Sequence, residues 1–173
     1  FLFGLLLIVF KYNKNNPQEV PFWITAKLLQ SAGSLILYHR ALAFDSLTVL
    51  ANVLLLLGCA YEAWAVRTLS GQTVKRQLHI STSVGIILVC LLTLFMDKPY
   101  RTGVTFLLQS TFYFLPGVFL LSKRAKKFSL QLLMAVCYSV AGLVFLVSAV
   151  ICLVFPGQAL ILNTNPIFGV IPG

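Results

Sequence analysis

Long runs of apolar residues alternate with short polar gaps along most of this chain. About 20 apolar residues are enough for a helix to cross a hydrocarbon core about 30 Å thick. Runs close to that length cover residues 22–38, 46–66, 78–96, 103–121 and 129–155, and shorter apolar pieces lie at 1–10 and 159–173. The pattern predicts a polytopic membrane protein with six to seven transmembrane helices.

The runs are solidly apolar, which favours helices over the strands of a membrane β-barrel, where apolar residues alternate with polar ones. Helices also satisfy their backbone hydrogen bonds within the segment, as lipid requires. Hydrophobic residues make up 59% of the chain and charged residues 10%, with a mean hydropathy of +0.93. Soluble proteins carry roughly 25% charged residues. We therefore expect residues 1–173 to form a single all-α transmembrane domain, without a second folded domain.

Both ends of the sequence are apolar and short. Residues 1–10 lack an initiator Met. No charged leader precedes them and no small-residue cleavage site follows, so they do not match the pattern of a signal peptide. Residues 159–173 turn apolar again after a polar gap. We expect both ends to belong to, or lie beside, further membrane helices.

The positive charges favour one set of gaps, and this sets the predicted orientation. Nine Lys and Arg residues fall in the first, third and fifth gaps, and three fall in the second and fourth: Lys11, Lys14, Arg67, Lys75, Arg76, Lys123, Arg124, Lys126 and Lys127 against Arg40, Lys98 and Arg101. Cytoplasmic loops carry the excess of such charge. The N-terminus is therefore expected outside, and the C-terminus in the cytoplasm if a seventh helix is complete. Loop charge of this kind contacts anionic membrane lipids, and we expect no nucleic-acid partner.

Two ionisable residues fall within the apolar runs, where charge is costly and often functional. Lys27 lies about 10 Å into the second helix from its cytoplasmic end, at a rise of 1.5 Å per residue. Glu62 lies at a similar depth in the third helix, which runs the opposite way. We predict an intramembrane ion pair between them. In the alternative, Lys27 extends to the headgroups, while Glu62 meets Arg67 or water.

A second polar group is predicted near the outer side of the membrane. It comprises Arg40, Asn52, Tyr100, Arg101 and Gln109. Together these side chains would suit an anionic or hydrogen-bonding ligand, either a small molecule or a lipid. In the alternative, the arginines anchor helix ends at the interface and the Asn hydrogen-bonds between helices.

Small residues and a proline indicate where helices approach closely or bend. Ser31, Gly33 and Ser34 would permit close packing of the second helix, although no strict GxxxG is present. Pro116 and Gly117 are expected to interrupt the fifth helix and kink it. They are candidates for a hinge, although many such kinks only shape a bundle.

Motifs for catalysis, metal binding and ion selection are missing from the sequence. It contains no HExxH, P-loop, GxSxG, paired intramembrane carboxylates, Arg-rich voltage sensor or potassium-channel filter. Four cysteines lie within apolar runs and read as small hydrophobic residues: Cys59, Cys90, Cys137 and Cys152. His39 and His79 flank opposite sides of the membrane, so they cannot share a metal. We expect no catalytic residue, metal site or cofactor, and hence no enzyme in this segment.

One stretch of the chain carries a family resemblance, at Trp23, Gly33, Arg40, Leu50-Ala51-Asn52, Gly58, Arg67 and Gly71. It resembles the N-terminal membrane sensor regions that precede GGDEF diguanylate cyclase or histidine kinase domains in bacterial signalling proteins. The later helices resemble these regions in spacing and charge placement. A departure is the outer loop, which reads Ala41-Leu-Ala-Phe-Asp45 where the family often has Pro. The resemblance implies a bacterial inner-membrane location, a homodimer and a cytoplasmic output domain that residues 1–173 do not include.

The leading functional hypothesis is a membrane-embedded sensor that relays a stimulus through its last helix to a cytoplasmic output domain. Two alternatives stay open. The first is a small transporter or channel that uses Lys27, Asn52 and Glu62 along a polar path. The second is a non-catalytic subunit of a larger membrane complex.

Overall fold

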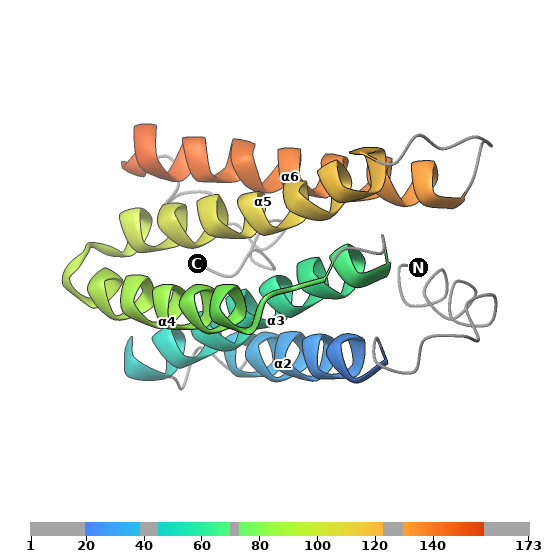
Figure 1. Ribbon diagram of the computed structural model, residues 1–173. Coiled ribbons are helices and arrows are strands. Elements are labelled where there is room, and N and C mark those ends of the chain that lie inside the picture. Colours follow the sequence, from blue (N-terminus) through green and yellow to red (C-terminus); the bar gives the residue numbers. More distant parts are fainter. Residues whose placement is uncertain (1–19, 39–44, 70–72, 123–129, 158–173) are drawn as a thin grey trace.

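In the computed structural model the chain is an all-helical bundle (Figure 1). The structure describes residues 20–38, 45–69, 73–122 and 130–157. Their helices are α2 (Val20–Tyr38), α3 (Asp45–Leu69), α4 (Arg76–Leu92), the short 3₁₀ helix η2 (Thr93–Phe95), α5 (Lys98–Ser122) and α6 (Leu130–Val154). The predicted all-α fold is thus confirmed for the described residues.

Four of these helices are long and apolar enough to cross a membrane: Ser46–Thr68, Arg76–Phe95, Lys98–Leu121 and Leu132–Val154. The predicted segment 22–38 is helical as α2, but it is not one of the four. The apolar pieces 1–10 and 159–173 lie outside the described residues. The structure therefore supports a membrane protein with at least these four candidate spans.

Helix ends differ from the predicted ones where polar residues continue a helix. The predicted run 103–121 begins earlier, at Lys98, because the polar first turn of α5 is also helical. The predicted run 78–96 is divided, since α4 ends at Leu92 and η2 turns the chain towards α5.

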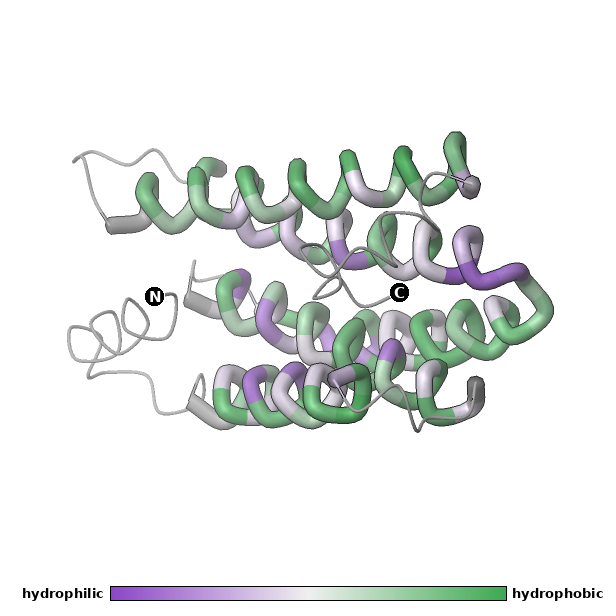
Figure 2. Tube along the Cα trace, turned by 180° about the vertical axis from the view of Figure 1, so that it is seen from behind, coloured by the Kyte–Doolittle hydropathy of each residue, from purple (hydrophilic) through white to green (hydrophobic). Residues whose placement is uncertain are grey.

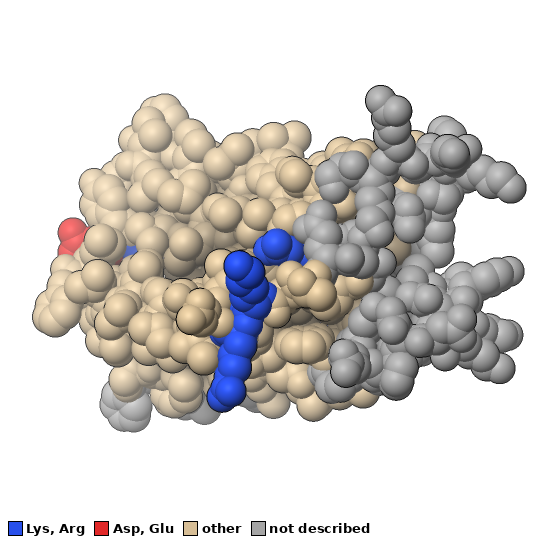
Figure 3. Space-filling model, viewed as in Figure 1, with Lys and Arg blue, Asp and Glu red and all other residues tan. Residues whose placement is uncertain are grey.

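The helices form two groups, with α5 and α6 on one side and α2, α3 and α4 on the other (Figures 1 and 2). Helix α3 is the central one. In its apolar 18-residue stretch 72% is buried, compared with 17% for the corresponding stretch of α4 and 22% for that of α6. Many of the exposed side chains on α4 and α6 are Leu, Ile or Val. The face shown in Figure 3 carries few charged residues among those described. An apolar exterior of this kind suits contact with lipid tails.

Helices α2 and α3 are in backbone contact through one glycine on each. A Cβ added to Gly33 would lie 2.8 Å from the Ala51 carbonyl oxygen, and one added to Gly58 would lie 2.8 Å from the Ala26 carbonyl oxygen. No side chain fits at such distances without a shift of the backbone. The expected close approach thus occurs at Gly33, whereas Ser31 and Ser34 are exposed.

Helices α5 and α6 are packed in a similar way. The Ser110 hydroxyl of α5 donates a 2.9 Å hydrogen bond to the Gly142 carbonyl of α6. Gly117 faces α6, where an added Cβ would lie 2.9 Å from Ser139 Oγ. Pro116 is buried inside α5, which continues from Lys98 to Ser122. The expected interruption at Pro116–Gly117 is therefore wrong, because the helix accommodates the proline, while a hinge role stays a prediction.

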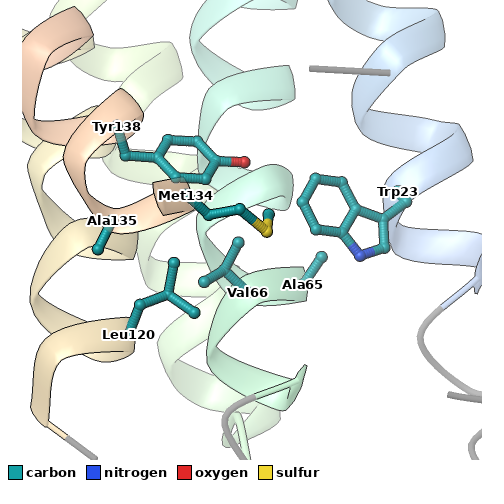
Figure 4. Close-up of a cluster of buried hydrophobic side chains, with 7 residues drawn as sticks. All are labelled: Trp23, Ala65, Val66, Leu120, Met134, Ala135 and Tyr138. Carbon is teal, nitrogen blue, oxygen red and sulfur yellow. The ribbon is translucent and has the colours of Figure 1, made fainter. Parts of the chain in front are cut away.

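Two apolar clusters join the groups of helices. The first contains Trp23, Ala65, Val66, Leu120, Met134, Ala135 and Tyr138 (Figure 4), and the second contains Val49, Leu56, Cys59, Ala60, Ile86, Cys90 and Phe112. Both are centred on α3. Helix α4 is attached near its start by an aromatic contact, in which the His79 and Tyr61 ring centroids lie 4.6 Å apart in an edge-to-face arrangement.

Candidate functional site at the centre of the bundle

Glu62 on α3 is the centre of a buried polar network. Only 2% of the Glu62 surface is exposed. Lys27 Nζ lies 2.8 Å from Oε2 and Gln30 Nε2 donates to the same oxygen at 2.7 Å. Tyr138 donates from its hydroxyl to Oε1 at 2.7 Å. Both carboxylate oxygens thus have partners, which offsets the cost of burying the charge.

The α2 side of the network follows from the helix contact at Gly58. Lys27 and Gln30 are three residues apart, so they share one face of α2, and Lys27 Nζ donates to Gln30 Oε1 at 3.0 Å. The backbone of Gln30 lies against Gly58, with its nitrogen 3.0 Å from the position of an added Cβ. Glu62 follows Gly58 by four residues and so lies one turn further along the same face of α3. The close packing of α2 on α3 therefore delivers both donors to the carboxylate.

The α6 side of the network is a single tyrosine whose ring is anchored in apolar surroundings. Tyr138 is 1% exposed and packs in the cluster that also contains Trp23 and Met134. Figure 4 shows its hydroxyl directed from α6 towards the side of α3 on which Trp23 lies. A buried tyrosine hydroxyl requires a hydrogen-bond partner, and Glu62 supplies it. Apolar packing thus sets the position of the ring, and the carboxylate fixes the hydroxyl.

Cys59 extends the network by one turn of α3. Gln30 Nε2 lies 3.8 Å from its Sγ atom. Tyr113 of α5 packs against the apolar cluster that contains Cys59. Cys59 and Glu62 together therefore meet side chains from α2, α5 and α6, so this turn of α3 is the junction of four helices.

The two charged members of the network differ in their access to the surface. The side chain of Lys27 is 27% exposed, whereas that of Glu62 is 3% exposed. The ammonium group is therefore at the edge of the bundle and the carboxylate is inside it. The carboxylate depends on its partners for stabilisation, while the lysine can also reach the surroundings along its aliphatic chain.

The Lys27–Glu62 separation of 2.8 Å is well within the limit of about 6 Å at which opposite charges influence each other. The alternative, in which Glu62 meets Arg67, is not the arrangement adopted. Arg67 instead lies over aromatic rings, with Cζ 5.9 Å from the Trp64 centroid and 5.4 Å from that of Phe119.

Sequence reasoning missed Gln30 and Tyr138. A signal for Gln30 was available, because a second polar residue three positions after Lys27 shares its helix face. Tyr138 gave a weaker signal: it is a tyrosine in an apolar run, and such residues also occur at membrane interfaces. Only the packing of α6 against α3 identifies its partner.

The described members of the predicted outer group differ in burial. Arg40 lies outside the described residues. Tyr100 is exposed, whereas Asn52 and Gln109 are buried. Arg101 is 8% exposed and donates to backbone carbonyls of the turn between α4 and α5, from Nε to Thr93 at 3.2 Å and from Nη2 to Met96 at 3.4 Å. These bonds give Arg101 a structural role at the turn, and a ligand for this group stays a prediction.

Two further observations concern metal binding and relatedness to known proteins. Within the described ranges, no group of three or more His, Cys, Asp or Glu side chains is placed to hold a metal ion. Comparison of the chain with protein-family models, curated proteins and solved structures found no match. Function is therefore inferred from the geometry of the network around Glu62.

Proposed function

We propose that this chain is the membrane-embedded sensor module of a bacterial inner-membrane signalling protein. Its task is to relay a stimulus through its last helix to a cytoplasmic output domain. One observation supports the proposal above others: a single buried carboxylate, Glu62, is bonded at 2.7–2.8 Å to side chains of both α2 and α6. A change at this point alters how three helices pack.

The physical basis is the directionality of the bonds at Glu62. Hydrogen bonds depend on direction, and they weaken steeply when the angle at the hydrogen falls below about 120°. The apolar contacts that α6 makes with α2 and α3 tolerate small shifts, because side chains such as Met134 can repack. A stimulus that favours one packing of α6 over another will therefore act on the Tyr138–Glu62 bond, and the population of each packing follows its free-energy difference. This is the behaviour that a receiver module requires.

The orientation proposed for the module has the N-terminus outside and the C-terminus in the cytoplasm, with six to seven membrane crossings in all. Helix α2 is included as a crossing. Its two most polar side chains, Lys27 and Gln30, both bond to Glu62, so they do not prevent α2 from lying in lipid beside α3. Lys75 and Arg76 at the start of α4 would then face the cytoplasm.

The family resemblance in the sequence supports the same proposal. Three of its positions, Trp23, Gly33 and Gly58, lie in the packing of α2 and α3. The resemblance also suggests a diguanylate cyclase or histidine kinase as the output domain, and a homodimer as the signalling unit. Both belong to this proposal.

The burial pattern along α3 favours a sensor over a transporter. The buried polar residues Asn52 and Glu62 are separated on α3 by three buried apolar residues: Leu55, Leu56 and Ala60. Carriers and channels use a connected series of polar groups to move their substrates. The buried polar residues in the described part of α3 lie at two separate levels instead.

The first experiment is to read the natural coding sequence beyond Gly173. The proposal expects it to continue into a cytoplasmic cyclase or kinase domain. A chain that ends within about 20 residues, which is one further crossing at most, would overturn it.

The second experiment measures output of the full natural protein in membranes, as cyclic dinucleotide formation or autophosphorylation. We expect Glu62→Gln to change the output several-fold at unchanged protein level. The control is Ser148→Ala, since this hydroxyl bonds only within α6, to the Val144 carbonyl at 2.9 Å. Equal output from the wild-type protein and both variants would contradict the proposal.

A further inference from the structure

We infer that the bundle contains two rigid helix pairs, α2–α3 and α5–α6, that shift against each other. The Tyr138–Glu62 hydrogen bond holds the two pairs in one relative position. As a route for a signal, the inference rests on the sensor function proposed above. The mechanical arrangement is separate from that function and is tested separately.

The α2–α3 pair is rigid because its backbones touch. Gly33 lies against the Ala51 carbonyl and Gly58 against the Ala26 carbonyl, each 2.8 Å from an added Cβ. The two contacts are reciprocal, since each helix supplies one glycine. A slide along the axis would bring a neighbouring side chain onto the backbone of the partner helix, and closely packed interiors resist such overlap.

The α5–α6 pair is held by glycines that face side chains of the partner helix and by one hydrogen bond to its backbone. Gly103 faces Leu153, whose Cδ2 would lie 2.7 Å from an added Cβ, and Gly142 faces the Phe114 ring at 3.1 Å. The Ser110–Gly142 hydrogen bond of 2.9 Å ties the middle of the two helices. This bond ends on a backbone carbonyl, so it does not move with a side-chain rotamer of α6.

The interface between the pairs has a different character. Contacts here run from side chain to side chain, as in the apolar cluster of Trp23, Met134 and Leu120 (Figure 4). Methionine and leucine chains can repack around a small displacement. Helix shifts of about 1–2 Å at such interfaces are a common form of conformational change. The interface is therefore where motion costs least.

Tyr138 supplies a directional bond across this interface, 2.7 Å from its hydroxyl to Glu62 Oε1. The other oxygen of the same carboxylate is bonded to Lys27 and Gln30, both of which belong to α2. Glu62 is thus fixed to the first pair by two donors and linked to α6 of the second by one. Loss of the Tyr138 bond would leave each pair intact and release one pair from the other.

The test uses distances between spin labels in the full chain, reconstituted in lipid. Cys137, the one of the four cysteines that is not buried, is first replaced by Ala. Labels at the exposed positions Leu28 and Val140 report on α2 against α6, across the interface. Labels at Leu28 and Leu50 report within the first pair, and labels at Val118 and Val140 report within the second.

We expect Tyr138→Phe to shift or broaden the distance across the interface by about 2 Å and to leave both distances within the pairs unchanged. Tyr100→Phe is the matched control, since it removes the same atom from an exposed residue. An unchanged distance across the interface, or equal changes within the pairs, would overturn the inference. Because no output is measured, failure of the sensor proposal would leave this result intact, and the reverse also holds.

Discussion

Lys27 and Glu62 form a 2.8 Å ion pair in which the two side chains are unequally buried, 27% exposed for the lysine and 3% for the glutamate. Removal of the lysine and removal of the glutamate therefore have different consequences for the charge that remains. A lysine at the edge of the bundle can turn outward, and a carboxylate inside the bundle cannot.

This asymmetry predicts that Lys27→Met destabilises the bundle more than Glu62→Gln does. The first leaves a buried carboxylate without its cation, which costs about 3–5 kcal/mol. The second leaves Lys27 free to extend towards the surface, so a loss of about 1–2 kcal/mol is expected from the altered hydrogen bonds. Unfolding in mixed micelles measures both.

The double variant Lys27→Met/Glu62→Gln provides the control for this pair. It should be less destabilised than the sum of the two single variants, since coupled residues are not additive. Equal losses from the two single variants, or a larger loss from Glu62→Gln, would show that the burial difference does not govern the pair.

A second prediction concerns the glycine contacts of α2 and α3. Gly58→Ala should destabilise the bundle by about 1–3 kcal/mol, the usual cost of overpacking, because its new methyl group would lie 2.8 Å from a backbone oxygen. Gly85 is the matched control, since nothing lies within 4 Å of an added Cβ there. Gly85→Ala should be neutral or stabilising by up to about 1 kcal/mol through helix propensity. Similar effects at the two positions would rule out backbone contact as the cause.

A third prediction concerns the turn between α4 and α5. Arg101→Met removes the donors to the Thr93 and Met96 carbonyls. We expect a loss of about 1–3 kcal/mol, because a hydrogen bond from a charged group is lost and the Thr93 carbonyl loses a donor. The exposed Lys98→Met should change stability by no more than about 0.5 kcal/mol. Thermal unfolding in detergent compares the two, and equal melting temperatures would contradict the role given to Arg101.

A fourth prediction tests the proposed orientation. Lys75 and Asp97 are exposed residues at opposite ends of the α4–η2 segment. In a chain with Cys137→Ala, a membrane-impermeant thiol reagent added to intact cells should label the variant Asp97→Cys. It should label the variant Lys75→Cys only after the membrane is opened. The reverse labelling pattern would require the opposite topology.

The network around Glu62 also shows which of its contacts could be predicted from the sequence. Equal depths of Lys27 and Glu62 on neighbouring antiparallel helices made their pairing one of two arrangements that the sequence left open, and the 2.8 Å separation distinguishes them. They did not indicate that Gln30 would share the same carboxylate oxygen, or that Tyr138 would take the other. The Tyr138 contact depends on the rotation of α6 about its axis, and the largely apolar sequence of α6 does not specify a face.

The amino-acid sequence by itself determined the helical membrane class, because long apolar runs leave the backbone no other way to satisfy its hydrogen bonds. It also made Lys27 and Glu62 candidates for a pair, and Ser31, Gly33 and Ser34 candidates for a point of close approach. The tertiary structure decided that α3 is the central helix, that Arg101 caps a turn, and that Pro116 lies in a continuous helix. It also decided that α6 reaches the carboxylate through Tyr138. The physical reason is that these features arise from which helix faces meet, and contacts between residues 76 positions apart are set by packing rather than by local pattern.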